Sequence, residues 1–178
     1  WNMKLKKMKN IVVIFFGDGA TEEGVFLESL DFASLHSLPV LFVCENNHFS
    51  VYSPLSNRQS KKRDIIKVAK AVGINGSKIH GNDVSNIYKK SKKIINNIKQ
   101  NSKPYILLLD TFRHLEHCGP NNDDNLNYRE KKYISKWIKK CPIAIAEKYL
   151  IKNNFIKKEE IKNFKKKIKT EIDKSFLF

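Results

Sequence analysis

The sequence is poor in the residues that build disulfide-linked or zinc-linked scaffolds. It contains three cysteines, Cys44, Cys118 and Cys141, which lie far apart and form no Cys-x-x-Cys pair. An odd number of widely spaced cysteines argues against a disulfide framework and against a zinc site. The same usage fits a reducing compartment, so we expect a cytoplasmic protein.

Long apolar runs are also missing. The basic segment 1–10 leads straight into an apolar run of only six residues, so no signal peptide is visible. No other run approaches the roughly 20 residues that a membrane span needs. We therefore expect no membrane partner.

Acidic residues are scarce relative to basic ones. The chain has 34 Lys and Arg against 18 Asp and Glu, which gives a net charge of +16. Such an excess raises the question of nucleic acid. The basic residues are mostly lysines interleaved with Ile and Asn, and no compact arginine cluster, zinc-finger spacing or RNA-binding aromatic motif is present. Because joint enrichment of Lys, Asn and Ile fits the codon bias of an AT-rich genome, we expect no nucleic-acid partner.

The most informative stretch is 11–49. Ile11–Phe16 is wholly apolar, which predicts a strand buried on both faces of a parallel sheet. Thr21 is expected to cap a helix that carries apolar side chains around much of its circumference. Pro39–Glu45 predicts a second buried strand. The three elements predict a βαβ unit in which both strands end at the same edge of the sheet.

Two polar turns follow these strands, Gly17-Asp18-Gly19 and Asn46-Asn47. Neighbouring strands lie roughly 5 Å apart, so Asp18 and Asn47 would face one crevice at the carboxyl edge, where open α/β sheets bind ligands. A carboxylate oxygen, an amide oxygen and a backbone carbonyl suit Mg²⁺, which takes its other ligands from phosphates and water. Free N–H groups at the start of the helix would bind the same anion. The stretch therefore predicts a site for a metal and a diphosphate.

The rest of the chain continues the α/β pattern. We expect a parallel sheet flanked by helices, with a helical, lysine-rich tail interrupted at Pro142. In this interpretation 1–130 form the α/β domain and 131–178 form helices that pack on it. Further elements are expected as helices at Lys61–Val72 and Val84–Asn101 and strands at Ser77–His80 and Pro104–Thr111.

The two turns and their spacing resemble a known fingerprint. Gly17-Asp18-Gly19, then 26 residues, then Asn46-Asn47, is similar to the motif of thiamine-diphosphate-binding domains. The flanking segments GDGATEEGVF and LPVLFVCENN resemble the alpha subunit of the decarboxylating component of 2-oxo acid dehydrogenases, of the pyruvate or branched-chain type. The plainer alternative is an Asp-Gly turn and an Asn-rich loop in an Asn-rich protein.

The resemblance assigns the residues of these turns to thiamine diphosphate and Mg²⁺. It implies that Asp18, Asn47 and the backbone carbonyl of Phe49 are the protein ligands of the metal. It also implies that the diphosphate lies against the backbone of Gly17, Gly19 and Ala20. We expect Arg58, in the polar loop after Asn47, to be an exposed loop residue rather than an anion contact.

A second cluster follows the last predicted strand, at 111–129. By the resemblance, Arg113 would help to neutralise phosphate or order the loop that ends in Tyr128-Arg129. His117 would be the catalytic residue, close to the thiazolium and the reacting oxo group, because imidazole exchanges protons near neutral pH. The alternative for His117 is a surface-loop histidine. His114 has no clear counterpart in the family.

The resemblance covers nearly the whole chain but only about the C-terminal half of a typical alpha subunit. We therefore expect the N-terminal part of the domain to be missing, or to be supplied by another polypeptide. The glutamate that activates thiamine diphosphate is not identifiable here, and a beta subunit provides it in two-subunit members of the family. The implied partners are this beta subunit, in an α₂β₂ heterotetramer, and a lipoyl-bearing acyltransferase.

The implied function is oxidative decarboxylation of a small 2-oxo acid, with acyl transfer to a lipoyl group. Two alternatives stay open. One is a transketolase-like or carboligating enzyme that uses the same cofactor, and the other is a truncated subunit that binds a partner without catalysis. Activity of the chain by itself is not expected.

Overall fold

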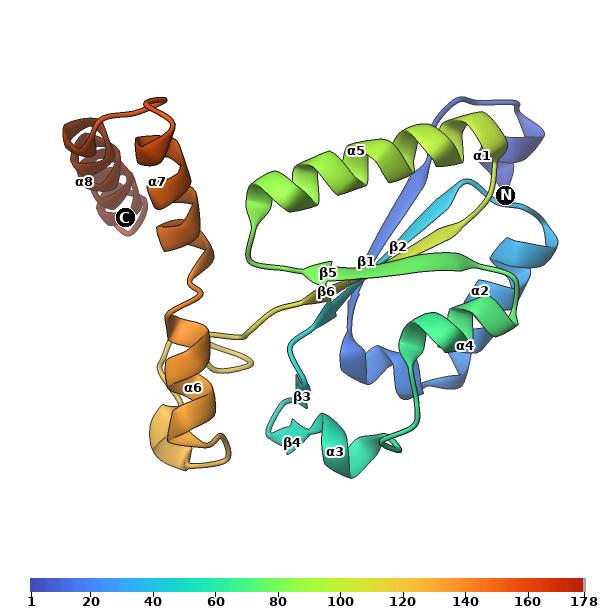
Figure 1. The fold of residues 1–178 in the computed structure, drawn as a ribbon, viewed down its shortest axis with the longest axis horizontal. Coiled ribbons are helices and arrows are strands. Elements are labelled where there is room, and N and C mark those ends of the chain that lie inside the picture. Colours follow the sequence, from blue (N-terminus) through green and yellow to red (C-terminus); the bar gives the residue numbers. More distant parts are fainter. Residues whose placement is uncertain (178) are drawn as a thin grey trace. The chain divides into compact units, whose positions relative to one another are not determined.

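A computed structural model of the chain describes residues 1–177. Its first part is built on a four-stranded, wholly parallel sheet with the strand order β1-β2-β6-β5 (Figure 1). The last strand in sequence, β6, therefore inserts between β2 and β5. The strands are β1 (Val12–Gly17), β2 (Val40–Asn46), β5 (Asn75–His80) and β6 (Tyr105–Asp110).

Helices cover both faces of this sheet. Helices α2 (Gly24–Leu35) and α4 (Ile65–Ala71) lie on one face, and α5 (Val84–Asn101) lies on the other (Figure 1). The side chains of β2 alternate between these layers, because successive residues of a strand point to opposite faces. Even-numbered residues Val40, Phe42 and Cys44 pack with α2 and α4, whereas Leu41 and Val43 pack with α5. The predicted α/β class is confirmed.

Short elements fill the loops of the first part of the chain. The pair β3–β4 forms a small antiparallel ladder directly after β2, and α3 follows it. Helix α6 packs through Ile134 and Trp137 against Phe112, just beyond β6. These elements are α1 (Asn2–Leu5), η1 (Asp18–Glu22), β3 (Phe49–Ser50), β4 (Ser53–Pro54), α3 (Leu55–Arg58), η2 (Asp124–Leu126) and α6 (Lys131–Ile138).

The chain divides into two compact units, 1–139 and 140–178. The second unit consists of α7 (Pro142–Lys152) and α8 (Lys158–Ser175), which are joined by an ion pair of 2.7 Å between Lys165 Nζ and Glu147 Oε1. This division falls after α6, and the predicted domain boundary at residue 130 stays a prediction. Packing of the tail on the α/β domain stays a prediction. None of the helices in 1–177 is long and apolar enough to cross a membrane.

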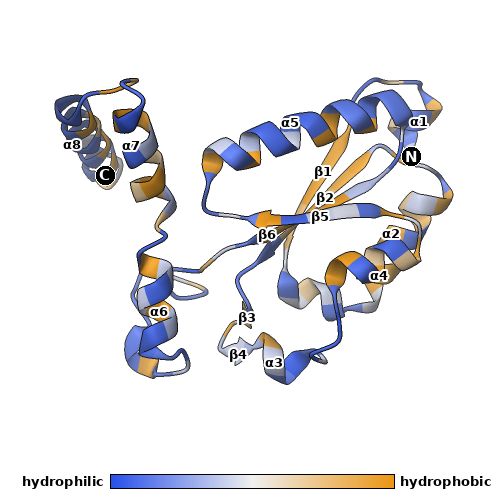
Figure 2. Cartoon of the chain, viewed as in Figure 1, coloured by the Kyte–Doolittle hydropathy of each residue, from blue (hydrophilic) through white to orange (hydrophobic). Residues whose placement is uncertain are grey.

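The expected burial of the first strand on both faces is wrong. β1 is the edge strand of the described sheet, with β2 as its single neighbour. Although β1 is strongly apolar (Figure 2), Val13 and Ile14 are 39% and 40% exposed, and Phe15 is 66% exposed. The composition of β1 is therefore that of an interior strand, but in the described sheet it has a neighbouring strand on one side only.

The predicted cap of the first helix is also wrong. A short 3₁₀ turn, η1, follows β1, and α2 begins only at Gly24 after Glu23. The Thr21 hydroxyl donates to the carbonyl of Asp18 at 2.7 Å and does not cap α2. The backbone after Gly19 is therefore a tight turn, and the N-cap of α2 is Glu23, two residues after the predicted Thr21.

The buried thiol of Cys44 offers a test of this packing. Burial, and after it the nearby Asp18, Glu45 and Asp110 carboxylates, raise the pKa of Cys44 to about 12. Since the thiolate is the reactive form, we expect iodoacetamide at pH 8 to alkylate Cys44 roughly a thousandfold more slowly than a free thiol. Mass spectrometry of the native chain should show modification at the exposed Cys118 instead. Equal labelling of both residues before unfolding would contradict the burial of β2.

Candidate functional site

A cavity of about 310 Å³ opens at the carboxyl end of β1, beside the segment that follows β2. Both strands end here because β1 and β2 run parallel in register from Val12 beside Val40 to Gly17 beside Glu45. The structure thus brings seven of the eight predicted site residues to one cavity, and Arg113 is the exception. The seven are Gly17, Asp18, Gly19, Ala20, Asn47, Phe49 and His117.

Asp18 is the most buried acid of the site, with 1% of its surface exposed. One carboxylate oxygen, Oδ2, pairs with Arg58 Nη2 at 2.5 Å. The other oxygen, Oδ1, is buried and has no hydrogen-bond partner. A buried acceptor without a partner costs free energy, so an unpartnered carboxylate oxygen in a cavity wall marks a place for a donor or a cation.

The turn after β2 fixes the other expected metal ligand. Asn47 Oδ1 accepts a hydrogen bond of 2.9 Å from the backbone N–H of Phe49, and Asn46 Oδ1 accepts one of 3.2 Å from His48. These side chain-to-backbone bonds are typical of asparagine turns, and they set the side chains before any ligand binds. Because a carbonyl oxygen has two lone pairs, Asn47 Oδ1 keeps one for a cation.

The donor set fits a small hard cation. It consists of one carboxylate, one amide and a backbone carbonyl, which are the oxygen donors that Mg²⁺ accepts together with phosphate and water. Among residues 1–177, no group of three or more His, Cys, Asp or Glu side chains is placed so that it could hold a metal ion. A cation held by one carboxylate would take its remaining oxygen ligands from water or from a bound anion.

Gly19 allows the loop after β2 to approach the turn closely. A Cβ atom at this position would lie 3.0 Å from Ser50 Oγ, which is closer than an ordinary contact. The missing side chain thus lets β3 pack against η1 and leaves the backbone of Gly19 and Ala20 facing the cavity. At Gly17, by contrast, a Cβ atom would meet open space.

The expectation that Arg58 is an exposed loop residue is wrong. Only 11% of its side chain is exposed, and its guanidinium contacts Asp18, Glu22 and the carbonyl of Ser53. Burial raises the pKa of Glu22, but hydrogen bonds from Arg58 and Gln59 outweigh it and hold the pKa below its ordinary value. Glu22 and Arg58 each follow one of the two motifs in the sequence. The composition of the loop does not reveal that two charged residues 36 positions apart form an ion pair.

A further charged group at the same edge was missed. Asp110 ends β6 and accepts a hydrogen bond of 3.1 Å from Asn46 Nδ2. Lys78 Nζ lies 2.8 Å and His48 Nε2 3.4 Å from its carboxylate. Burial raises the pKa of Asp110, but the hydrogen bonds from His48 and Lys78 outweigh it and hold the pKa below its ordinary value. Asp110 therefore holds β2, β5 and the Asn46 turn together.

Arg113 lies outside the cavity and contacts the loop after β6. Its Nη2 donates to the Tyr128 hydroxyl at 2.7 Å and to the Val51 carbonyl at 2.9 Å, and it lies 3.4 Å from Asp123 Oδ2. Of the two roles proposed for Arg113, these contacts favour ordering the loop. His117 is exposed and lines the cavity, whereas His114 is half-buried, with its Nε2 atom unpartnered.

A buried ion pair closes the same loop. Arg129 Nη2 lies 2.5 Å from Asp123 Oδ1, and 2% and 3% of the two side chains are exposed. Asp123 also accepts a hydrogen bond of 2.6 Å from the Tyr128 hydroxyl. Burial raises the pKa of Asp123, but Tyr128, Arg129 and Arg113 outweigh it and lower the pKa. The loop that carries His117 is thus anchored at its far end.

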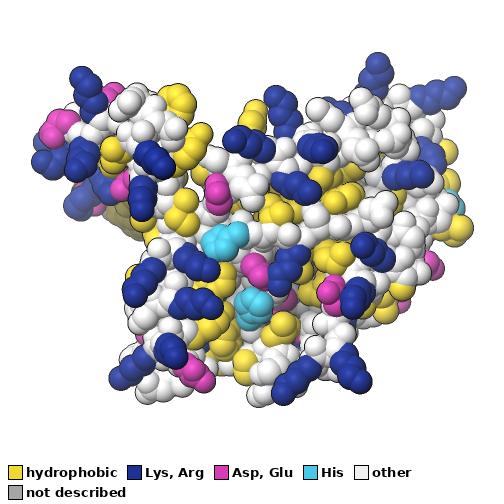
Figure 3. All heavy atoms as spheres, viewed as in Figure 1, with side chains coloured by type: hydrophobic (Ala, Val, Ile, Leu, Met, Phe, Trp, Pro, Cys, Tyr) yellow, Lys and Arg dark blue, Asp and Glu magenta, His cyan; other side chains and the backbone are white. Residues whose placement is uncertain are grey.

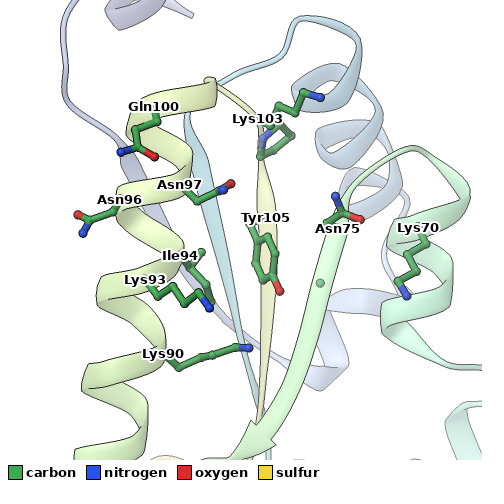
Figure 4. Close-up of a pocket in the computed structure, with 12 residues that line it drawn as sticks. Lys70, Asn75, Lys90, Lys93, Ile94, Asn96, Asn97, Gln100, Lys103 and Tyr105 are labelled. Atoms are coloured by element: carbon green, nitrogen blue, oxygen red, sulfur yellow. The ribbon is translucent and has the colours of Figure 1, made fainter.

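Another hollow, of about 600 Å³, lies at the amino-terminal ends of β5 and β6 (Figure 4). These are the ends of the strands opposite to the Asp18 turn, so the hollow is separate from the candidate cation site. Lys and Arg side chains are spread over the visible face of the molecule (Figure 3). The polar side chains that line the hollow are Lys70, Lys90, Lys93, Lys103, Asn75, Asn96, Asn97, Gln100 and Tyr105.

Comparison with known proteins matches residues 1–177 to the dehydrogenase E1 component family. A pyruvate dehydrogenase E1 component subunit alpha of Rickettsia bellii is 29% identical over 175 residues, which are 98% of this chain and 52% of that protein. The chloroplastic subunit alpha-3 of Arabidopsis thaliana is 32% identical over 170 residues, 95% of this chain and 39% of that protein. The chain spans about half the length of the curated relatives that it matches.

Among solved structures, one described as a thiamin diphosphate-dependent enzyme from Mycobacterium smegmatis superposes with a TM-score of 0.49. It is 21% identical and covers 62% of this chain and 20% of that chain. The likeness is too weak to bear on the site.

The Asp123–Arg129 pair yields a stability test. We expect Asp123→Asn to lower the free energy of unfolding by about 3 kcal/mol at pH 7, because it removes the buried ionic partner of Arg129 and leaves only the more exposed Asp124. Since the pKa of Asp123 is lower in the folded than in the unfolded chain, its stabilisation is present above about pH 4 and is lost as the pH falls. Urea unfolding at several pH values should show the wild type and the variant converging in acid.

Asp124→Asn is the matched control for this test. Asp124 also contacts Arg129, at 2.9 Å, but 29% of its side chain is exposed. The effect of Asp124→Asn should be smaller than that of Asp123→Asn. A loss for Asp123→Asn that is the same at pH 3 and pH 7 would show that charge is not its source.

Proposed function

This chain belongs to the dehydrogenase E1 component family, and we propose that it is the part of an E1 alpha subunit that binds Mg²⁺ and the diphosphate of thiamine diphosphate. The observation that carries the proposal is the unpartnered, buried Oδ1 atom of Asp18 in the wall of a cavity that also contains Asn47. A cation at this oxygen would satisfy the buried acceptor. The family match supplies the identity of the cofactor.

Each residue of the cavity would have a distinct task. Asp18 Oδ1, Asn47 Oδ1 and the Phe49 carbonyl would hold Mg²⁺, and the N–H groups of Gly19 and Ala20 would face the diphosphate. Gly17 would leave room for the ligand, because a Cβ atom at its position meets open space. When bound, thiamine diphosphate would supply the carbanion chemistry that a 2-oxo acid needs to lose CO₂.

His117 is our candidate for proton transfer. It is exposed and lines the same cavity as Asp18, so its imidazole can reach a substrate that enters from solvent. A neutral imidazole can accept a proton and an imidazolium can donate one to the oxo oxygen of the substrate. Oxidative decarboxylation of a small 2-oxo acid, with acyl transfer to a lipoyl group on an acyltransferase, is the reaction that we propose.

The exposed edge of the sheet supports a further polypeptide in the complete protein. β1 leaves one edge open and its apolar side chains 37–66% exposed from Val12 to Phe15. We propose that a strand from the half of the alpha subunit that this chain does not span pairs with β1. We also propose a beta subunit, in an α₂β₂ assembly, and a cytoplasmic location, which the three free cysteines favour.

Calorimetric titration of thiamine diphosphate into the chain, with and without Mg²⁺, tests the proposed site. We expect heat of binding only when Mg²⁺ is present, because the cation joins the diphosphate to Asp18. Asp18→Ala should abolish that heat, since it removes the one carboxylate of the donor set. Asp31→Ala, at an exposed position of α2, is the control and should bind as the wild type does.

The titration has a second stage, which uses the proposed partners of the chain. If the chain does not bind, the titration is repeated with the remaining half of the alpha subunit and a beta subunit from a relative. Binding that returns and again requires Asp18 would support the proposal. Continued absence of binding, or binding that ignores Asp18→Ala, would refute the cofactor site.

A further inference from the structure

We propose that Arg58 is a built-in counter-ion for Asp18, so that its guanidinium and a divalent cation compete for one carboxylate. The inference rests on the proposed function only in taking Asp18 as a cation ligand. It adds a second state of the site, in which the positive charge that Asp18 needs comes from the chain itself.

The geometry of Arg58 is that of a bridge. Its Nη2 atom lies 2.5 Å from Asp18 Oδ2, its Nη1 atom pairs with Glu22, and its Nε atom donates to the Ser53 carbonyl at 3.2 Å. A planar guanidinium with five N–H groups can serve three acceptors at once, which a lysine ammonium cannot do in this arrangement. One side chain therefore joins both acids of η1 to the loop after β2.

Burial makes this positive charge necessary. Asp18 is 1% exposed, and among residues 1–177 Arg58 is its one ion-pair partner. A buried carboxylate without a counter-charge carries a large desolvation penalty. Without Arg58, the turn after β1 would need a cation at Asp18 to supply the missing counter-charge.

Occupation by both cations is unfavourable. Mg²⁺ bonds oxygen at about 2.1 Å, so a metal on Oδ1 would lie within a few ångströms of a guanidinium on Oδ2. Two positive charges at such a separation repel each other, and burial limits the screening by water. The guanidinium thus lowers the affinity of the site for a cation, and binding of the cation weakens the Arg58–Asp18 pair.

Glu22 keeps Arg58 at the site when the pair with Asp18 breaks. Arg58 ends α3, which lies beside η1 (Figure 1). Its Nη1 atom would lie 3.7 Å from a Cβ atom at Gly19, so the guanidinium stands next to the backbone that we assign to the diphosphate. An arginine released from Asp18 but still paired with Glu22 would face that anion, to which arginine binds well.

Titration of the full chain with Mn²⁺, followed by electron paramagnetic resonance, tests the competition. Mn²⁺ serves as the probe because it accepts the same oxygen ligands as Mg²⁺. We expect Arg58→Met to bind Mn²⁺ at least about tenfold more tightly than the wild type. A neighbouring positive charge lowers the affinity of a carboxylate for a proton by about tenfold or more, and we expect a similar effect on its affinity for a metal cation. Arg63→Met is the matched control, because Arg63 contacts the same turn at the Thr21 carbonyl without an ion pair to Asp18.

Thermal unfolding provides a second measurement, which needs no cation. Arg58→Met should lower the melting temperature by roughly 6 °C or more, because it leaves a buried charge unpaired. The double variant Asp18→Asn with Arg58→Met should recover most of that loss, and Mn²⁺ should stabilise Arg58→Met but not the double variant. If Arg58→Met is unfolded at room temperature, Mn²⁺ is expected to refold it.

The proposal is overturned if Arg58→Met binds Mn²⁺ no more tightly than the wild type, or if Mn²⁺ neither stabilises nor refolds it. If the chain nevertheless binds thiamine diphosphate in a Mg²⁺-dependent manner, the competition would be refuted and the proposed cofactor site would not. Tighter binding of Mn²⁺ to Arg58→Met in a chain that never binds thiamine diphosphate would support the competition and refute the proposed function.

Discussion

The parallel register of β1 and β2 is the constraint on which the site depends. Because Gly17 lies beside Glu45, the residues that follow each strand, Asp18 and Asn47, reach the same cavity. A slip of one residue would turn the side chains of β2 from one helical layer to the other, so the packing of Phe42 and Leu41 on opposite faces fixes the register. The hydrophobic core thereby sets the distance between two polar side chains that belong to neither layer.

Neutralisation of buried acids is the second theme of the structure. The chain carries a net charge of +16, but the two most buried carboxylates are each neutralised by a specific arginine and not by the general excess of positive charge. Asp18 pairs with Arg58, and Asp123 pairs with Arg129, in contacts that are almost closed to solvent. Arginine is suited to both places, because its guanidinium binds several acceptors in one plane. Neither of these buried pairs contains a lysine, and lysine side chains are rarely fully buried in proteins.

Local sequence patterns were enough to predict most elements of the fold. Val84–Asn101 is a helix over the predicted range, because Ile87, Ile94 and Ile98 recur at helical spacing. β1 shows where such patterns fail: its apolar composition predicts an interior strand, but exposure depends on neighbours that the described chain does not supply. Arg58 shows the same limit for the site, because its partners Asp18 and Glu22 are 40 and 36 residues away. Motif spacing predicted that Asp18 and Asn47 lie at one cavity, as they do, whereas tertiary pairing could not be deduced from composition.

In the site that we propose, the turns after β1 and β2 hold one cation between them. Anomalous diffraction from crystals of the assembled protein grown with Mn²⁺ and thiamine diphosphate would locate that cation directly. We expect a single strong peak within bonding distance of Asp18 Oδ1 and Asn47 Oδ1, with the guanidinium of Arg58 no longer on Asp18. A peak at Asp110 or elsewhere, with Asp18 still paired to Arg58, would contradict the placement of the cation between Asp18 and Asn47.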